Sequence, residues 1–140
     1  MQVVPYRPGL LNVLVAFPYF NASVVQILRQ RAGEFNLLID SGAFTAWRSG
    51  TSIRLRDYCK FIDLVPISAV AYFMLDVIYN PQETEDNFRK MRARGYAPWP
   101  VFTPGSSWAQ FDYYYAESDV LACGGLANKY DAKSQQWLKT

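Results

Sequence analysis

Hydrophobic residues along this chain fall into short continuous runs, which alternate with stretches where they recur every three or four positions. A continuous run of about four to eight apolar residues is typical of a buried strand, and the wider spacing is typical of a helix with one buried face. The continuous runs predict strands over 11–17, 36–40, 69–78, 99–102 and 120–124. The spaced stretches predict helices over 21–33, 54–64, 80–95, 108–117 and 131–138.

Residues that favour turns and caps mark the ends of these elements. Asn21 or Ser23 can cap the first helix, which we expect to stop at Gly33. Asn80-Pro81 opens the charged third helix, because proline is favoured at the first helical position, and Gly95 closes it.

Strands and helices therefore alternate with short connectors. Such alternation implies a parallel sheet, either doubly wound or closed into a (β/α) barrel. The chain has 140 residues, whereas a complete eight-unit barrel needs about 250. We expect an α/β fold in a single domain over residues 1–140, either a small open sheet or a partial TIM-like barrel of about five βα units.

Polar or glycine-containing segments follow the predicted strands. The carboxyl ends of parallel strands share one edge of a sheet, and active sites of such folds lie there. We therefore expect one functional face and an enzyme scaffold. The segments are Asp40-Ser41-Gly42-Ala43-Phe44, Asp76, Thr103-Pro104-Gly105-Ser106-Ser107 and Cys123-Gly124-Gly125-Leu126.

Asp40 has two interpretations. Asp-Ser-Gly is common in turns, so the carboxylate can simply turn the chain. At a strand end, where burial tunes its pKa, it can instead act as a general base or hydrogen-bond a substrate. Gly42 then lets the backbone approach a ligand closely, and Phe44 offers a ring for stacking. Phe44 can equally be a packing residue, which is how we interpret Trp47.

Asp76 lies in an otherwise apolar run, where an unpaired carboxylate is costly. It can cap the helix that begins near Asn80-Pro81. It can instead bind the edge of a guanine-like ring, whose two parallel N–H donors suit one carboxylate. Thr103 can supply a hydroxyl to a ligand or close a loop. Gly124-Gly125 can present backbone N–H groups or form a tight turn.

Composition narrows the chemistry. Apolar residues make up 51% of the chain and aromatic residues 16%, which excludes global disorder. The absence of histidine excludes imidazole catalysis and histidine metal sites within this chain. Cys59 and Cys123 are too few and too far apart for a zinc knuckle or a disulfide framework, and we interpret both as buried or neutral thiols in a reducing compartment. We expect neither a metal nor a cofactor in this chain.

Charge is nearly balanced. The chain has 14 basic and 12 acidic residues and a net charge of +2, which does not by itself indicate nucleic-acid binding. We interpret the basic stretch over 89–94 as a solvated helix face, and Tyr113-Tyr114-Tyr115 as a helix edge or a surface for a partner. No signal-peptide pattern occurs and no apolar run approaches about 20 residues. We therefore expect a soluble, cytoplasmic protein with no membrane partner.

The strand-end segments, taken together, resemble the tRNA-guanine transglycosylase superfamily, and most closely its compact phage-type members, which insert 7-deazaguanine bases into DNA. The resemblance extends from Leu11 to about Leu126. Its motifs are short and follow successive strands. They are Asp40-Ser41-Gly42-Ala43-Phe44, Leu75-Asp76-Val77, Asn80-Pro81 with Thr84 and Asn87, Pro100-Val101-Phe102, and Gly124-Gly125-Leu126.

The resemblance implies a (β/α)₈ enzyme in which an Asp attacks the ribose, guanine leaves, and a deazaguanine takes its place. It makes Asp40 the acid/base carboxylate, Phe44 the stacking platform and Asp76 the group that holds the N1 and 2-amino edge. The implied partners are a 7-deazaguanine base and nucleic acid, DNA in preference to tRNA, with the target nucleotide flipped out. The remaining residues of the expected base-binding set are Ser41, Gly42, Thr103, Gly124, Gly125 and Leu126.

The chain departs from this family in three ways. Thr103 falls near the place where the tRNA enzymes carry a glutamine. The family's nucleophilic Asp follows the Gly-Gly-Leu segment, where this chain has only Asp131, in a predicted helix. The cysteine/histidine zinc site of the tRNA enzymes has no counterpart.

The chain thus resembles the N-terminal half to two-thirds of an enzyme. We expect a second chain that completes the barrel, or a homo-oligomer. An open half-barrel leaves an edge strand and an apolar face exposed, which predicts association.

Two alternatives remain at this stage. The chain can be a non-catalytic binding or assembly protein derived from this fold, in which Asp40 and Asp76 matter only for folding. Binding of a deazaguanine distinguishes that function from base exchange. The chain can also be an unrelated open α/β nucleotide-binding protein, although the residues after Phe17 show no Gly-x-Gly-x-x-Gly loop.

Overall fold

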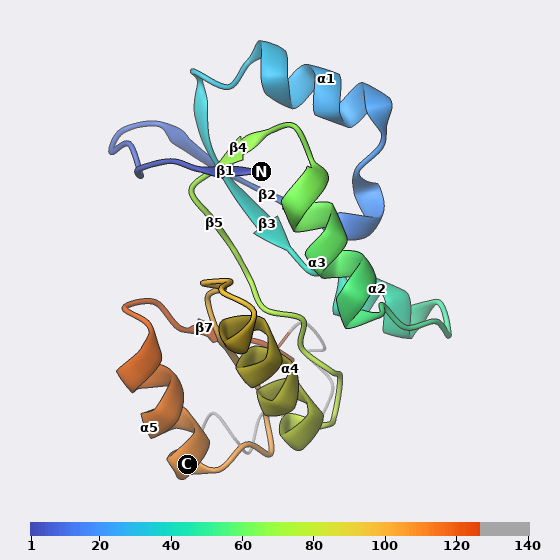
Figure 1. Cartoon of the computed structure of the whole chain (residues 1–140), viewed down its shortest axis with the longest axis vertical. Helices are drawn as coiled ribbons and strands as arrows, with labels where there is room; N and C mark the ends of the chain where they lie inside the picture. Colours follow the sequence, from blue (N-terminus) through green and yellow to red (C-terminus); the bar gives the residue numbers. More distant parts are fainter. Residues whose placement is uncertain (127–140) are drawn as a thin grey trace. The chain divides into compact units, whose positions relative to one another are not determined.

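We analysed a computed structural model of the chain, in which residues 1–126 are described (Figure 1). The helix predicted over 131–138, with Asp131, lies outside the described residues. The chain divides into two compact units, Met1–Leu75 and Asp76–Thr140. We call them unit 1 and unit 2 and describe each by itself.

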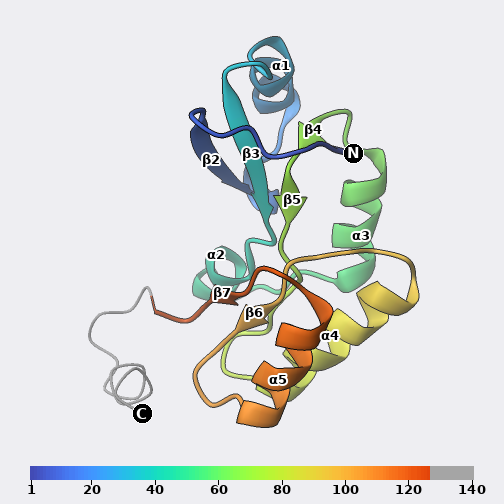
Figure 2. The same ribbon diagram turned by 90° about the vertical axis from the view of Figure 1, so that its left-hand side faces the viewer.

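Unit 1 is an α/β unit with parallel strands. The main sheet has the order β2-β3-β5, and these strands lie side by side in Figure 2. β2 pairs with β3 from Leu11↔Phe35 to Ala16↔Asp40, and β5 joins the other edge of β3. β1 and β4 form a separate parallel pair. The elements are β1 (Gln2–Val3), β2 (Leu11–Ala16), the 3₁₀ turn η1 (Phe17–Tyr19), α1 (Ala22–Gln30), β3 (Phe35–Asp40), α2 (Ala43–Arg48), α3 (Leu55–Leu64), β4 (Ser68–Ala69) and β5 (Ala71–Tyr72).

The core of unit 1 centres on β3. Leu37 and Ile39 are buried, as is Tyr58 of α3, and each large apolar side chain that is fully buried contributes about 1.5–3 kcal/mol. The Tyr58 hydroxyl donates to the Phe73 carbonyl oxygen at 2.7 Å, which ties α3 to the segment after β5. These contacts hold the carboxyl end of β3 in place.

Asn36 is the buried polar residue of β3. Its Oδ1 accepts the Arg7 N–H at 2.9 Å, and its Nδ2 donates to the Arg7 carbonyl oxygen and to Asn12 Oδ1 at 2.9 and 3.1 Å. The amide is therefore satisfied, as a buried polar group must be. It fixes the segment before β2 against β3.

Unit 2 contains α4 (Pro81–Ala93), β6 (Val101–Phe102), α5 (Trp108–Glu117) and β7 (Ala122–Cys123), and β6 and β7 pair in parallel. Asn80 caps α4, because its Oδ1 accepts the Glu83 N–H at 3.0 Å. Phe88 of α4 meets Tyr114 of α5 edge to face, with ring centroids 5.1 Å apart. Both side chains are fully buried and form the core between the two helices.

All four helices predicted within residues 1–126 are present, with small shifts at their ends. Asn21 is the cap of α1, since its side chain accepts the Val24 N–H at 3.0 Å, so the alternative cap Ser23 is wrong. α1 ends at Gln30, before the predicted stop at Gly33. Gly95 follows α4 with φ 88°, as expected for a residue that ends a helix.

The strand predicted over 69–78 is wrong beyond its start. Met74 and Leu75 are buried, yet they follow β5 rather than extend it. Just after the predicted strand, Tyr79 has φ 59°, a left-handed conformation. The continuous apolar run therefore indicates that the segment is buried, but it does not show whether the segment forms a strand. The strands predicted over 99–102 and 120–124 are likewise shorter, as β6 and β7.

Three elements were not predicted from the sequence: β1, η1 and α2. β1 has two residues and lies just before Pro5, and η1 has three residues. α2 has six residues, too few turns to show a helical period.

The predicted fold class is confirmed at the level of an α/β protein with alternating strands and helices in small parallel sheets. The sheets formed by residues 1–126 do not close into a barrel. No helix in this part of the chain is long and apolar enough to cross a lipid bilayer.

Candidate functional site

Asp40 is the last residue of β3, at the carboxyl edge of the main sheet. Its side chain is half-buried, and Oδ2 accepts the Gly42 N–H at 3.3 Å. Burial raises the pKa of the Asp40 carboxyl above its ordinary value, while the backbone N–H groups of Gly42 and Ser41 offset part of that rise. Asp40 therefore forms the expected turn and also has the raised pKa that suits an acid/base group.

Ser41 and Gly42 build the turn into α2. The Ser41 side chain is fully buried, and its Oγ accepts the Ala43 N–H at 3.3 Å. Gly42 has φ 78°, and a Cβ at this position would lie 2.2 Å from Cδ of Pro18. The close approach expected of Gly42 is therefore made to Pro18 of η1. Ser41 and Gly42 therefore fix the turn that joins Asp40 to α2.

α2 carries two aromatic rings at the protein surface. Phe44 is 37% exposed and Trp47 is 44% exposed. Their rings stack with centroids 5.9 Å apart and planes at 29°, and the Arg48 guanidinium carbon lies 5.8 Å from the Phe44 centroid. Trp47 therefore packs against Phe44, and the two rings together form an exposed aromatic surface.

In unit 2, Asp76 begins the segment that leads to α4. The alternative in which Asp76 caps this helix is wrong, because Asn80 does so. The segment is held in place by Thr84, whose Oγ1 accepts the Val77 N–H at 2.8 Å. Within it, Tyr79 adopts its left-handed conformation, which costs of order 1–3 kcal/mol and is common in functional segments.

The Asp76 side chain is half-buried and lies within electrostatic range of α5. Burial raises the pKa of the Tyr114 hydroxyl, and the negative charges of Glu85 and, more weakly, Asp76 raise it further. Among residues 1–126, the buried Tyr114 hydroxyl has no hydrogen-bond partner, and neither does Gln110 Oε1. The surroundings of Asp76 therefore include buried polar groups from α4 and α5.

Thr103 and the glycines after β7 lie together in unit 2. Thr103 is buried, with its Oγ1 3.4 Å from Ser106 Oγ. A Cβ at Gly124 would lie 2.6 Å from Val101 Cγ1 and 3.3 Å from Thr103 Cγ2. The Gly124 N–H donates to the Phe102 carbonyl oxygen at 2.9 Å, so it belongs to the β6–β7 ladder and not to a ligand-binding turn.

Gly125 and Leu126 complete this segment. Gly125 has φ 70°, and a Cβ there would lie 2.8 Å from Cδ of Pro104. Leu126 is half-buried. The two cysteines differ in exposure, since Cys59 is buried and Cys123 is exposed.

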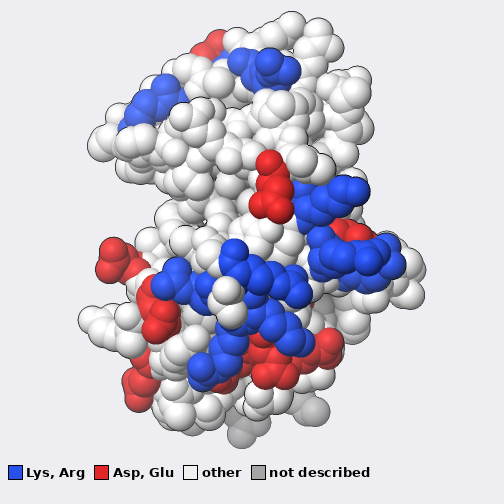
Figure 3. Space-filling view, viewed as in Figure 1, with Lys and Arg blue, Asp and Glu red and all other residues white. Residues whose placement is uncertain are grey.

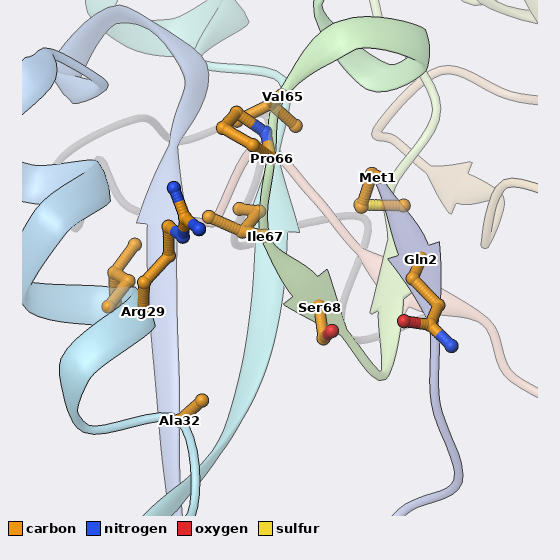
Figure 4. Close-up of a pocket in the computed structure, with 9 residues that line it drawn as sticks. Met1, Gln2, Arg29, Ala32, Val65, Pro66, Ile67 and Ser68 are labelled. Atoms are coloured by element: carbon orange, nitrogen blue, oxygen red, sulfur yellow. The ribbon is translucent and has the colours of Figure 1, made fainter.

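One hollow of unit 1 lies away from these residues. It has a volume of about 380 Å³, and in Figure 4 the Arg29 side chain of α1 reaches toward Ile67 across it. Its walls include the starts of β1 and β4, whereas ligand sites of α/β folds lie at the carboxyl ends of parallel strands. We therefore do not assign the site to it. The lining residues are Met1, Gln2, Leu28, Arg29, Ala32, Val65, Pro66, Ile67 and Ser68.

Two cations of the basic stretch over 89–94, Arg89 and Arg92, form ion pairs. Arg89 lies 2.6 Å from Glu85 and over the Tyr113 ring at 3.9 Å, and Arg92 lies 3.3 Å from Glu117. Figure 3 shows these Lys and Arg side chains over α4 with acidic groups beside them. The contacts agree with a solvated helix face.

The sequence reasoning missed the exposure of Trp47 and the conformation of Tyr79. Helical spacing could have placed Phe44, Trp47 and Arg48 on one surface, had α2 been recognised. Within the described residues no cluster of three or more Asp, Glu or Cys side chains could hold a metal ion.

Comparison with known proteins gives no match. No family model matches the sequence, and neither does a curated protein or a solved structure. The function therefore has to be argued from the residues and their geometry.

Proposed function

We propose that this chain is the base-binding part of a base-exchange glycosyltransferase of the guanine transglycosylase type, which replaces guanine in DNA with a 7-deazaguanine. One observation carries the proposal. A half-buried carboxyl with a raised pKa, Asp40, ends a central parallel strand, and four residues later Phe44 stands exposed on a short helix. An acid/base group beside a ring that can stack is what chemistry on a nucleobase requires.

Asp40 handles the proton in the proposed reaction. An aspartate nucleophile forms a bond to the ribose C1′ as the glycosidic bond breaks, and the departing guanine takes its electron pair and a proton from Asp40. The incoming 7-deazaguanine then gives its N9 proton to the Asp40 carboxylate and displaces the enzyme from C1′. Asp40 ends the cycle protonated, as it began.

Asp76 recognises the ring edge in this proposal. Guanine and 7-deazaguanine both present N1–H and a 2-amino group side by side, and one carboxylate can accept both hydrogen bonds. Asn80, and not Asp76, provides the cap of α4, so the helix itself does not explain a carboxylate at position 76. Contacts of the Thr103 hydroxyl and of the Gly125 and Leu126 backbone with the base stay predictions, whereas the Gly124 N–H is already used in the β6–β7 ladder.

The nucleophile is proposed to come from the remaining strands of a barrel, supplied by a second chain or segment. The open edge of the main sheet supports this. Among the described residues β2 pairs only with β3, and its Leu11 and Leu14 are 71% and 59% exposed. A six-residue edge strand that is apolar apart from Asn12, without charge or proline, is prone to pair with another strand.

The same edge strand favours a second candidate function, a non-catalytic assembly protein derived from this fold. Such a protein uses β2 to associate and has no need of a ring-binding site. The two candidates differ in whether the chain, alone or in its assembly, binds a deazaguanine.

Calorimetric titration of the purified protein with 7-deazaguanine tests the proposal. We expect binding, with 7-deazaadenine much weaker because it lacks the N1–H and 2-amino donors. Asp76→Asn should weaken binding by roughly 10-fold or more, the size of a lost charge-assisted pair. Phe44→Ala should weaken it by roughly 5-fold or more.

Asp112→Asn is the matched control, because Asp112 is an exposed carboxylate of unit 2 outside the proposed site. It should bind as the wild type does. Equal binding of both ring compounds, or no binding by any assembly of the chain, overturns the proposal in favour of the assembly protein.

A further inference from the structure

A surface of unit 1 combines exposed aromatic rings with cations. We call it the α2–α3 surface, and it consists of Phe44, Trp47, Arg48, Arg54 and Arg56. The two rings are stacked on each other, and the side chains of Arg54 and Arg56 are 70% and 78% exposed. Figure 3 shows Lys and Arg gathered over α2 and α3.

Positive charge predominates on this surface. Residues 43–64, which span α2 and α3, contain the four cations Arg48, Arg54, Arg56 and Lys60 and the two carboxylates Asp57 and Asp63. Asp57 lies 2.7 Å from Arg54 and 3.8 Å from Arg56, so it neutralises at most part of the group. A strongly anionic partner therefore complements the surface.

We propose that the α2–α3 surface binds single-stranded DNA, with a base stacked on Trp47 and phosphates against the arginines. The proposed function assigns Phe44 to the target base, so the new contact is made by Trp47 and the arginines, and it would hold the strand beside the target nucleotide. The choice of DNA rests on the proposed function. The stacked base and the phosphate contacts are argued from the surface itself.

The chemistry of the surface fits this partner better than a protein. Every nucleobase has a π-face, so stacking on an exposed tryptophan tolerates any sequence. Arginine pairs with phosphates through a planar fork and also stacks on rings, as Arg48 does near Phe44. An apolar protein surface would leave the cations unmatched, and an acidic peptide would leave the rings unused.

The rings stand on a helix that is fixed at both ends. At its start, Gly42 lies against Pro18 in a way that no side chain at position 42 would allow. At its end, the Thr51 N–H and Oγ1 both donate to the Ala46 carbonyl oxygen, at 2.9 and 3.1 Å. A pre-organised platform loses little conformational freedom on binding, which favours affinity.

Fluorescence anisotropy with labelled oligothymidine of about 12 nucleotides, within the usual site size for single strands, tests the inference on the full chain. Oligothymidine contains no guanine, so it probes the surface without the exchange site. We expect binding that weakens with salt, and a roughly 10-fold loss of affinity in Trp47→Ala. Trp47→Phe should stay within about 3-fold of the wild type, because it keeps a ring.

Arg48→Gln provides a second readout that does not alter the rings. It should weaken binding and reduce the slope of log affinity against log salt by about 0.7, the release of one phosphate contact on a single strand. Trp108→Ala is the matched control, since Trp108 of α5 is also an exposed tryptophan, at 65%. It should bind as the wild type does.

Three results overturn the inference: no binding at low salt, unchanged affinity in both Trp47→Ala and Arg48→Gln, or tighter binding of the same sequence as RNA. If Trp47→Ala loses its helical circular dichroism, Arg48→Gln decides alone. Loss of oligothymidine binding with 7-deazaguanine binding intact rejects this surface only. The converse result rejects the exchange function and leaves the surface standing.

Discussion

At the scale of residues, the segment 40–44 contains two residues that shape the turn and two that can contact a ligand. Ser41 is fully buried and Gly42 lies against Pro18, so both shape the turn. Asp40 stays half-buried and Phe44 exposed, so both can meet a ligand. The sequence predicted this segment as functional, but it could not separate the two roles, because Pro18 is far from Gly42 along the chain.

Gly42→Ala tests the role of Gly42 in shaping the turn. We expect it to lower the free energy of unfolding of unit 1 by more than about 2 kcal/mol, because it adds a clash with Pro18 to the strain of a positive φ. Gly50→Ala separates the two effects, because Gly50 has φ 70° with no atom near its Cβ position. The free energy of unfolding of the Gly50→Ala variant should fall by only about 1 kcal/mol. Urea unfolding measures both, and equal losses would contradict the close approach.

Asp40→Asn tests the chemical role through pH. The folded state raises the pKa of Asp40 by burial, so folding favours its protonated form. Stability from this group is present below the unfolded pKa, about 3.9, and is lost as pH rises through the raised folded value. Asp40→Asn should therefore be more stable than the wild type at pH 7 and equal to it near pH 3, by thermal melts. A variant that is less stable at pH 7 contradicts this assignment.

At the scale of elements, helices were predicted well and short strands poorly. α4 carries its own signals, Asn80 and Pro81 at its start and Gly95 after its end, and these act within a few residues. β4 and β5 depend on pairing with β1 and β3, far away in the chain. The run over 69–78 was apolar because it is buried, and only the fold decides which of its residues join a sheet.

Two buried tyrosines make a matched test of how the elements are joined. The Tyr58 hydroxyl is hydrogen-bonded to the Phe73 carbonyl oxygen, whereas the Tyr114 hydroxyl has no partner in the described part of the chain. Tyr58→Phe should cost about 1 kcal/mol of unfolding free energy, because a buried carbonyl loses its donor. Tyr114→Phe should leave stability unchanged or raise it. A similar loss in both variants, by urea unfolding, would show that Tyr114 has a partner after all.

At the scale of the whole molecule, the alternation of elements predicted the α/β class but not the extent of the sheets. Local patterns set the order of strands and helices, whereas closure depends on how strand edges meet, which no short pattern encodes. Among residues 1–126, β2 is an edge strand of the main sheet. Its Leu11 and Leu14 are exposed, which supports the expectation that the chain associates.

Leu14→Lys tests that association. A charge on an exposed edge strand discourages pairing with another strand, so this variant should shift the protein toward the single chain of 16.0 kDa in sedimentation. Its melting temperature, measured on the single chain, should change little because Leu14 is 59% exposed. An unchanged assembly would place the interface away from β2.

Native mass spectrometry of the purified protein with 7-deazaguanine tests the central claim most directly, because it reports the assembly and its ligand together. The account predicts a ligand-bound species, in an assembly larger than one chain, and its loss in Asp76→Asn but not in Asp112→Asn. A spectrum in which no species carries 7-deazaguanine, with the protein folded, would contradict the base-exchange function.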